Sequence, residues 1–219
     1  MNSMVVFISL PPPAVKDVGR VNVLWFYFYR SLHVTLGQDF LLALPDGDIW
    51  IFGYGSLMWR PGFPHLDFHP ALLRGYHRAL CVYSVEYRGT FDCPGLVFGL
   101  DLGGSCRGRA MRVERGQATS VLEYLHEREM KHRVYLPKWL PVKIPTGTVQ
   151  AYCFTVDRDH ERHTGALADE VALKLIHQGY GKGGACLDYL QNTIQHLDEL
   201  GITDGPLHRI VRLAEGSNP

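Results

Sequence analysis

The order of the hydrophobic patterns along the chain constrains its fold most strongly. From Trp50 to about Asp157, short runs rich in β-branched and aromatic residues, such as ALCVYSVEY and TVQAYCFTVD, alternate with turn residues. Such runs are typical of β-strands. After Asp157 the apolar residues recur at helical spacing instead. Strands followed by helices predict an α+β fold, in which a small curved-sheet β-barrel carries attached helices.

Turn residues predict where the strands reverse direction. Gly103-Gly104 and Thr146-Gly147 stand at positions where hairpin turns are expected. One helix, in QATSVLEYLHERE, interrupts the strands. It begins either near Ala118 or at a capping box formed by Ser120 and Glu123.

Three helices are expected in the C-terminal part of the chain. The first ends at Gly179, the second ends at Gly201, and Pro206 opens a short third one. The second helix carries four apolar residues at helical spacing, namely Leu187, Leu190, Ile194 and Leu197. This spacing predicts one buried face.

The composition is that of an ordinary globular protein and excludes some partners. Of the 219 residues, 46% are hydrophobic and 20% are charged, which is enough apolar material for one sizeable domain. Basic and acidic residues number 22 each, so no overall field favours nucleic acid or an anionic membrane surface. We therefore expect neither as a partner.

Residues 1–47, with a proline cluster and an aromatic run, are predicted to be an N-terminal extension of unknown role, and residues 48–219 to be the functional domain.

The apolar runs and the cysteines indicate a cytoplasmic protein. The run VNVLWFYFY is too short to span a bilayer, and the start of the chain lacks the layout of a secretory signal. The five cysteines are widely spaced and form no C-x-x-C pair. A reducing compartment is the simpler setting for such cysteines.

The stretch WIFGYGSLMWR, from Trp50 to Arg60, begins as a strand and is then interrupted by small residues. Gly53, Gly55 and Ser56 surround Tyr54 at this point. Glycine permits positive φ angles and close approach to the backbone, so several N–H groups can point at one place. Such a concavity suits a carboxylate or a phosphate. An ordinary bulge or tight turn would have the same sequence.

The helix that precedes Met130 carries three glutamates that cannot all face the same way. At about 100° per residue, the apolar residues define one arc of the helix surface. Glu129 falls inside this arc, whereas Glu123 and Glu127 fall outside it. A carboxylate aimed at the interior has a raised pKa, as a general acid or base requires. The alternatives are that the helix frays before Glu129, or that Arg128, Lys131 or Arg133 pairs with it.

Three further motifs carry weaker signals. GYGKGGA, Gly179 to Ala185, follows a helix rather than a strand and lacks the Ser or Thr of a phosphate loop, so a helix stop and turn is favoured. His160 and His163 have no third ligand at a recognisable spacing. Cys93 has no identifiable histidine partner. We therefore expect no metal site and no cofactor.

Five stretches of the sequence resemble the γ-glutamylcyclotransferases of the ChaC type. They are DIWIFGYGSLMWRPGF, YRGTFDCPGLVFGLDLGGSCRGRAMRV, YLHEREM, LPVKIPTGTVQAYCFTVD and GYGKGGACLDYLQNTIQHLDELGI. They occur in the family's order and span about Asp48 to Leu213. The resemblance implies a small β-barrel with attached helices that cleaves glutathione, its small-molecule substrate, into 5-oxoproline and cysteinylglycine.

The resemblance also implies which residues form the site. It assigns the substrate-cradling loop to Tyr54, Gly55, Ser56 and Leu57, and the catalytic glutamate to Glu129. It places Arg88 and Tyr189 among the substrate-binding residues. The alternatives are a cyclotransferase for other γ-glutamyl amines or dipeptides, and a non-catalytic protein that regulates cation transport.

Overall fold

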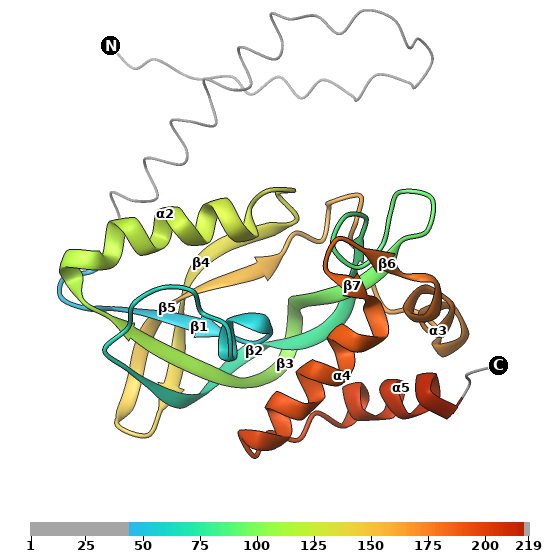
Figure 1. The fold of residues 1–219 in the computed structure, drawn as a ribbon. Coiled ribbons are helices and arrows are strands. Elements are labelled where there is room, and N and C mark those ends of the chain that lie inside the picture. The colour runs from blue at the N-terminus through green and yellow to red at the C-terminus, as the bar shows by residue number, and fades with distance from the viewer. Residues whose placement is uncertain (1–43, 217–219) are drawn as a thin grey trace, which may run out of the picture. The chain divides into compact units, whose positions relative to one another are not determined.

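The computed structural model describes residues 44–216, which form a closed five-stranded barrel with attached helices (Figure 1). The strand order around the barrel is β1, β3, β2, β4, β5, and all neighbours are antiparallel except β1 and β5. The strands span Ile49–Gly53 (β1), Asp67–Ser84 (β2), Gly95–Val113 (β3), Tyr135–Ile144 (β4) and Gly147–Val156 (β5). The predicted α+β barrel is confirmed. Residues 1–43 of the predicted N-terminal extension lie outside the described residues, so the boundary at residue 48 stays a prediction.

The helices lie on two sides of the barrel (Figure 1). One side carries α2, and the other carries α3, α4 and α5, whose bounds are Ala118–Glu129 (α2), Asp169–Gln178 (α3), Cys186–Glu199 (α4) and Gly205–Gly216 (α5). Two short 3-10 turns, η1 (Ser56–Met58) and η2 (Arg115–Gln117), and a two-residue hairpin, β6 (Tyr180–Gly181) with β7 (Gly184–Ala185), complete the described elements. The three predicted C-terminal helices are confirmed.

One predicted hairpin turn is wrong. Thr146-Gly147 does connect β4 to β5, but β3 runs without interruption through Gly103-Gly104. These two glycines have φ angles of 100° and 68° and lie opposite Gly75 of β2, where the register of the ribbon shifts. A bulge of this kind bends and twists a strand pair. The glycines therefore curve one long ribbon around the barrel instead of ending it.

Helix α2 begins at the earlier of its two predicted starts. It starts at Ala118, and the Ser120 hydroxyl donates to the Gln117 carbonyl, so Ser120 and Glu123 form no capping box. The apolar arc is as expected, with buried side chains at Ala118, Val121, Leu122 and Leu125. Because these four residues anchor the helix on the barrel, the direction of every other side chain on α2 is fixed.

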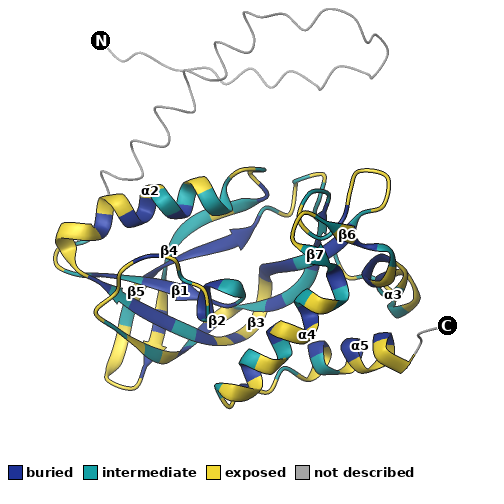
Figure 2. Cartoon of the chain, in the orientation of Figure 1, coloured by how far each residue is buried: buried dark blue, intermediate teal, exposed yellow. Residues whose placement is uncertain are grey.

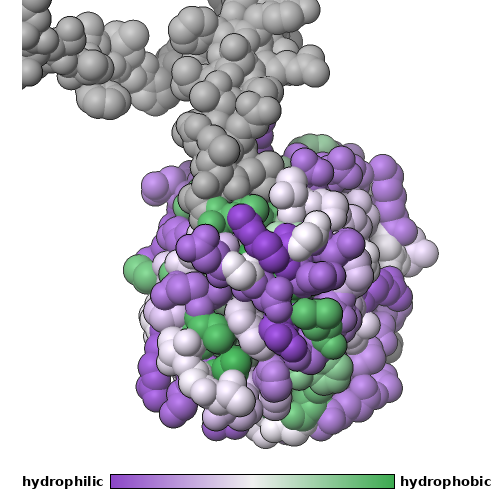
Figure 3. All heavy atoms as spheres, turned by 90° about the vertical axis from the view of Figure 1, so that its left-hand side faces the viewer, coloured by the Kyte–Doolittle hydropathy of each residue, from purple (hydrophilic) through white to green (hydrophobic). Residues whose placement is uncertain are grey.

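The barrel and the C-terminal helices share one core. Buried residues are concentrated on the strands and on the helix faces turned towards them (Figure 2). Leu73 and Leu100 from the barrel belong to the same cluster as Leu175 of α3, Leu190 of α4 and Ile210 of α5. On the face that is turned to the viewer in Figure 3, hydrophobic residues among those described occur in small groups between hydrophilic ones. Among residues 44–216 no helix has the length and hydrophobicity needed to cross a membrane.

A buried arginine of β2 joins three parts of the fold. The Arg78 side chain is 3% exposed. Its guanidinium donates to the carbonyls of Tyr54, at 2.5 Å, and Arg107, at 2.8 Å, and to the Asp204 carboxylate at 2.6 Å. Asp204 lies just before α5 and also accepts the Leu207 N–H at 3.2 Å. Each of the three guanidinium nitrogens thus donates a hydrogen bond, which offsets the cost of burying the charge.

We expect Arg78→Leu to lower the free energy of unfolding by about 3 to 5 kcal/mol, because it leaves a carboxylate and two carbonyls without their donor. Urea unfolding followed by tryptophan fluorescence measures this loss. Arg209→Leu is the control, because Arg209 pairs with Asp169 on the surface, where both side chains are about half exposed. It should change the midpoint little. Equal effects of the two substitutions would contradict this role of Arg78.

Candidate active site

A small pocket forms where the end of β1, the end of α2 and the start of α4 meet the barrel. Nine residues line it, namely Tyr54, Gly55, Ser56, Leu57, Phe98, Glu129, Tyr135, Phe154 and Tyr189. The structure therefore brings together six of the seven residues predicted for the site. They come from segments far apart in the sequence, and only the closed barrel makes them neighbours.

The glycine turn after β1 forms one wall of the pocket. The sequence suggested that Gly53 and Gly55 would have positive φ angles, but neither does. Gly53 instead permits close packing of the chain. A Cβ on Gly53 would lie 3.2 Å from the Leu57 Cβ and from the Met58 backbone nitrogen, which is tighter than ordinary van der Waals contact. The chain can therefore fold back at once into η1. The first N–H groups of such a turn have no partner within it, so they remain available as donors.

Glu129 is the last residue of α2, so the helix does not fray before it. Its carboxylate lines the pocket, whereas Glu123 and Glu127 are exposed. The helical-wheel prediction for all three glutamates is confirmed. Burial raises the pKa of Glu129 above its ordinary value, while the neighbouring Arg128 guanidinium opposes this shift.

Arg128 connects the carboxylate to the glycine turn. Its Nε lies 3.0 Å from Glu129 Oε1, so the pairing proposed as an alternative role for Glu129 is present as well. The same guanidinium donates to the Ser56 hydroxyl at 3.0 Å and to the Arg60 carbonyl at 2.7 Å. One planar group thus fixes Glu129 relative to the turn. Lys131, another predicted partner, pairs with Glu86 instead at 2.6 Å.

Three tyrosines supply hydroxyl groups around the carboxylate. Desolvation raises the pKa of Tyr54, Tyr135 and Tyr189, and the charge of Glu129 adds to each shift. The hydroxyls therefore stay protonated and can donate hydrogen bonds. Tyr135 donates to the Phe98 carbonyl at 2.8 Å, which fixes its ring in the wall.

Arg88 is the predicted site residue that does not line the pocket. Its guanidinium lies over the ring of Tyr189, 5.1 Å from the centroid, and donates to the carbonyls of Gly183 and Ala185. Its predicted contact with substrate stays a prediction. In this structure Arg88 packs on the ring of Tyr189, which itself lines the pocket.

The GYGKGGA motif forms the β6–β7 hairpin, which packs on the loop that carries Arg88. Lys182 N–H and Gly183 N–H donate to the carbonyls of Glu86 and Tyr87, at 2.9 and 2.8 Å. A Cβ on Gly181 would lie 2.5 Å from the Glu86 carbonyl oxygen, so only glycine permits this approach. The predicted helix stop and turn is confirmed, and its glycines serve backbone packing.

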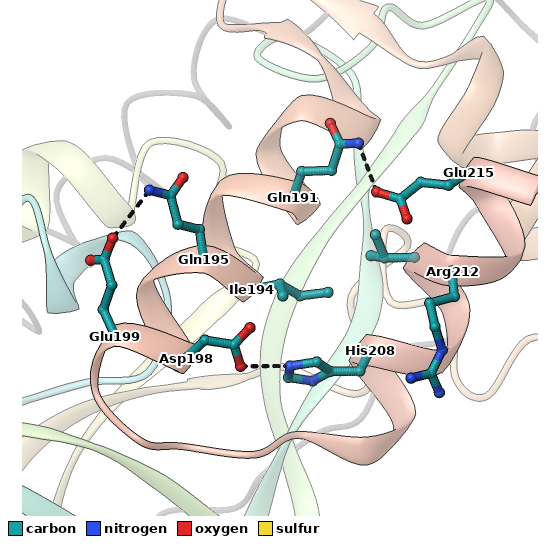
Figure 4. Close-up of a pocket in the computed structure, with 9 residues that line it drawn as sticks. Gln191, Ile194, Gln195, Asp198, Glu199, His208, Arg212 and Glu215 are labelled. Atoms are coloured by element: carbon teal, nitrogen blue, oxygen red, sulfur yellow. Dashed lines mark hydrogen bonds and ion pairs between the residues drawn. The ribbon is translucent and has the colours of Figure 1, made fainter.

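A larger hollow of about 530 Å³ lies between α4 and α5 (Figure 4). Most of its polar side chains pair with one another across or along it, as Gln191 does with Glu215 and Asp198 with His208. It is open to solvent and contains no buried carboxylate. The residues predicted for the site line the pocket at Glu129, and none of them lines this groove.

Comparison with known proteins identifies the family. A family model described as ChaC-like protein matches residues 49–216. The chain belongs to the ChaC-like family.

Two curated relatives of this ChaC-like chain are named as enzymes. It is 35% identical over 191 residues to the glutathione-specific gamma-glutamylcyclotransferase of Escherichia coli (strain K12), covering 87% of this chain and 82% of that protein. It is 33% identical over 190 residues to glutathione-specific gamma-glutamylcyclotransferase 1 of Rattus norvegicus, covering 83% and 77%. A crystal structure of the selenomethionine-labelled yeast cyclotransferase specific to glutathione shares the fold, with a TM-score of 0.72 at 20% identity, over 78% of this chain and 97% of that one.

Three pocket residues of the ChaC-like chain were missed by sequence reasoning. Phe98, Tyr135 and Phe154 lie within runs that read as ordinary strands. Alternation along a strand shows which residues share a face, but not that this face meets the end of α2. The weaker candidate Cys93 is exposed. Of the two candidate histidines, His160 has its Nε2 3.0 Å from the His132 carbonyl, and His163 has its Nε2 3.5 Å from Asp101 Oδ2.

The raised pKa of Glu129 predicts how a substitution changes stability with pH. Because its pKa is raised, the Glu129 carboxyl binds a proton more tightly in the folded state than in the unfolded chain. The stability that this proton contributes is present below about pH 4.5 and is lost as pH rises through the folded pKa. A glutamine at position 129 cannot ionise, so the Glu129→Gln variant does not lose this stability as pH rises. We therefore expect the melting temperature of Glu129→Gln to exceed that of the native chain increasingly as pH rises from 4 to about 8.

Thermal melts of both proteins at several pH values measure this difference. Glu127→Gln is the matched control, because the Glu127 side chain is exposed on the same helix. Its difference from the native chain should show no comparable trend. A constant difference for Glu129→Gln would mean that the carboxylate is not desolvated in solution.

Proposed function

We propose that the chain is a glutathione-specific γ-glutamylcyclotransferase, which converts glutathione to 5-oxoproline and cysteinylglycine. The observation that carries the proposal is a desolvated carboxylate, Glu129, in one small pocket with the glycine turn Tyr54–Leu57. The curated relatives from Escherichia coli and rat, which bear this activity in their names, support the same conclusion.

The reaction needs little covalent help from the protein. The α-amine and the γ-carbonyl belong to the same γ-glutamyl residue, so the nucleophile is already tethered to its target. The amine nitrogen forms a bond to the γ-carbon, the amide bond to the cysteine nitrogen breaks, and no water is consumed. Well-oriented intramolecular attack of this kind is worth effective molarities of about 10⁵ M or more.

The protein must therefore hold the γ-glutamyl group folded and move one proton. We assign the proton to Glu129: once the α-ammonium has lost a proton to solvent, the neutral amine attacks, and Glu129 takes one proton from the attacking nitrogen and delivers it to the departing nitrogen. A raised pKa suits this role, because the carboxylate must both accept and release the proton. Arg128 keeps the carboxylate aimed at the turn by binding Glu129 and Ser56 together.

Binding of the γ-glutamyl group is assigned to the turn and the tyrosines. We assign binding of its α-carboxylate or of the developing oxyanion to backbone N–H groups of the turn from Tyr54 to Leu57. The protonated hydroxyl of Tyr189 is a further donor, and Arg88 acts through the Tyr189 ring that it covers. Phe98 and Phe154 line the pocket, and we assign to their apolar rings the exclusion of water from the reacting atoms.

The cysteines favour the cytoplasm as the place of reaction. All five are free in the structure, and four of them are buried. Unpaired cysteines persist in a reducing compartment, so we place the enzyme in the cytoplasm.

We expect the purified chain to consume glutathione and to release 5-oxoproline and cysteinylglycine in equal amounts, because ring closure and amide cleavage are one reaction. Chromatography with mass detection measures both products. γ-Glutamyl-alanine and ε-(γ-glutamyl)-lysine, assayed in parallel, test whether the preference is for glutathione. Release of free glutamate would indicate hydrolysis and would overturn the cyclotransferase proposal.

Glu129→Gln keeps the size of the side chain and its acceptor for Arg128 but cannot carry the proton. We expect kcat to fall by a factor of about 10² to 10⁴. Binding of 5-oxoproline, measured by calorimetry, should stay within a few-fold, because the turn forms the anchor. In the control, Glu127→Gln, kcat should be nearly unchanged. Near-normal turnover of Glu129→Gln, or equal losses in both variants, would show that another group moves the proton.

A further inference from the structure

Three potential metal ligands meet outside the candidate active site. The Cys81 sulfur, a carboxylate oxygen of Asp101 and a ring nitrogen of His163 all lie within 4.8 Å of one another. Cys81 is on β2, Asp101 is on β3, and His163 is in the connection between β5 and α3. Cys81 is 2% exposed, and the side chains of Asp101 and His163 are 10% and 7% exposed. The three groups are therefore enclosed together.

Asp101 and His163 face each other, and the other hydrogen bonds of this cluster involve the second carboxylate oxygen of Asp101. Asp101 Oδ1 accepts the Leu102 N–H at 2.7 Å, and Arg158 Nε lies 3.3 Å from the same oxygen. Asp101 Oδ2 lies 3.5 Å from His163 Nε2, and this nitrogen is buried without a hydrogen-bond partner. A buried polar atom without a partner is rare and costs free energy. A bound ion would satisfy it.

The spacing fits a tetrahedral metal. With zinc bond lengths, two neighbouring ligand atoms of a tetrahedron lie about 3.4 to 3.6 Å apart. The distance of 3.5 Å between His163 Nε2 and Asp101 Oδ2 already has this value. The Cys81 sulfur lies within 4.8 Å of both of these atoms. Thiolate, imidazole and carboxylate together favour Zn²⁺ over Mg²⁺ or Ca²⁺, which prefer oxygen ligands.

The backbone holds the three ligands in place. Thr164 N–H donates to the Cys81 carbonyl, and Tyr83 N–H donates to the Arg162 carbonyl, both at 2.9 Å. His163 itself forms a bridge with Val82. A Cβ on Gly99 would lie 2.8 Å from the Cys81 sulfur, so this glycine leaves room for the thiol.

The neighbouring charge does not block an ion. Arg158 contacts Asp101 through Oδ1, whereas His163 lies beside Oδ2, and the Arg158 side chain is 57% exposed. Its repulsion of a cation is therefore screened by solvent. Its contact instead orients the carboxylate, as partners of metal ligands commonly do.

We propose that Cys81, Asp101 and His163 bind one Zn²⁺ ion in a structural or regulatory site, with a fourth position left for water. On binding, the thiol proton passes to solvent. The ion lies behind the pocket wall and not in it, because Cys81 belongs to the buried cluster against which the pocket residue Tyr135 packs. It therefore fastens the connection between β5 and α3 to the barrel and takes no part in the reaction.

Titration of the metal-free full chain with Co²⁺ tests the site. We expect one ion per chain, with the near-ultraviolet absorption of a thiolate–cobalt bond and the visible bands of tetrahedral cobalt. One equivalent of Zn²⁺ should remove this spectrum and raise the melting temperature. Because these readouts need no turnover, they remain informative even if the proposed cyclotransferase activity fails.

Variants assign the ligands. His163→Gln should abolish the cobalt spectrum and the zinc-dependent rise in melting temperature, while circular dichroism stays native. Two controls should retain both: His160→Gln, from the same segment, and Cys93→Ser, which removes the exposed thiol. Absence of cobalt binding by the native chain at micromolar metal would overturn the proposal, as would loss of the spectrum in Cys93→Ser.

If His163→Gln does not fold, Cys81→Ser serves as the ligand variant. A thiolate–cobalt band that is retained in Cys81→Ser would overturn the proposal.

Discussion

The buried guanidinium of Arg78 is the interaction on which the arrangement of the site depends. A charge with 3% exposure costs free energy unless its donors have partners. Its partners are the Tyr54 carbonyl in the glycine turn, the Arg107 carbonyl of β3 and the Asp204 carboxylate before α5. The Tyr54 carbonyl is thus tied to the same side chain as β3 and the segment before α5. The C-terminal helices, which contribute Tyr189, are fixed relative to the turn by the same group.

A second arginine sets the balance between stability and chemistry in the pocket. Placing Glu129 at the end of α2 desolvates its carboxylate, which disfavours the charged form. Arg128 offsets part of this cost and, through Ser56, ties the carboxylate to the turn. The four buried apolar residues of α2 supply the anchoring that keeps an unfavourable group in place. The site thus holds a carboxylate where its charged form is unfavourable, on a helix that is firmly packed against the barrel.

Two glycines near the candidate site, Gly53 and Gly181, act by being small. Gly53 lets β1 fold back into η1, and Gly181 lets the β6–β7 hairpin reach the backbone of the Arg88 loop. Sequence reasoning treated both motifs as turns, which is correct for the local chain path. It could not show which distant backbone each glycine faces, because the contacted segment lies many residues away. The same limit explains the error at Gly103-Gly104, where a bulge and a hairpin turn have the same local sequence.

The sequence by itself determined the order of strands and helices and the face of α2 on which Glu129 lies. These features depend on local periodicity, since the direction of a side chain follows from its position on a helix or strand. Only the tertiary structure decided that Phe98, Tyr135 and Phe154 complete the pocket, that Arg78 meets Asp204, and that His163 lies beside Cys81 and Asp101. Each of these contacts joins segments separated along the chain and arises when the barrel closes and the C-terminal helices pack on it. Closure depends on the packing of the whole core, which no short stretch of sequence encodes.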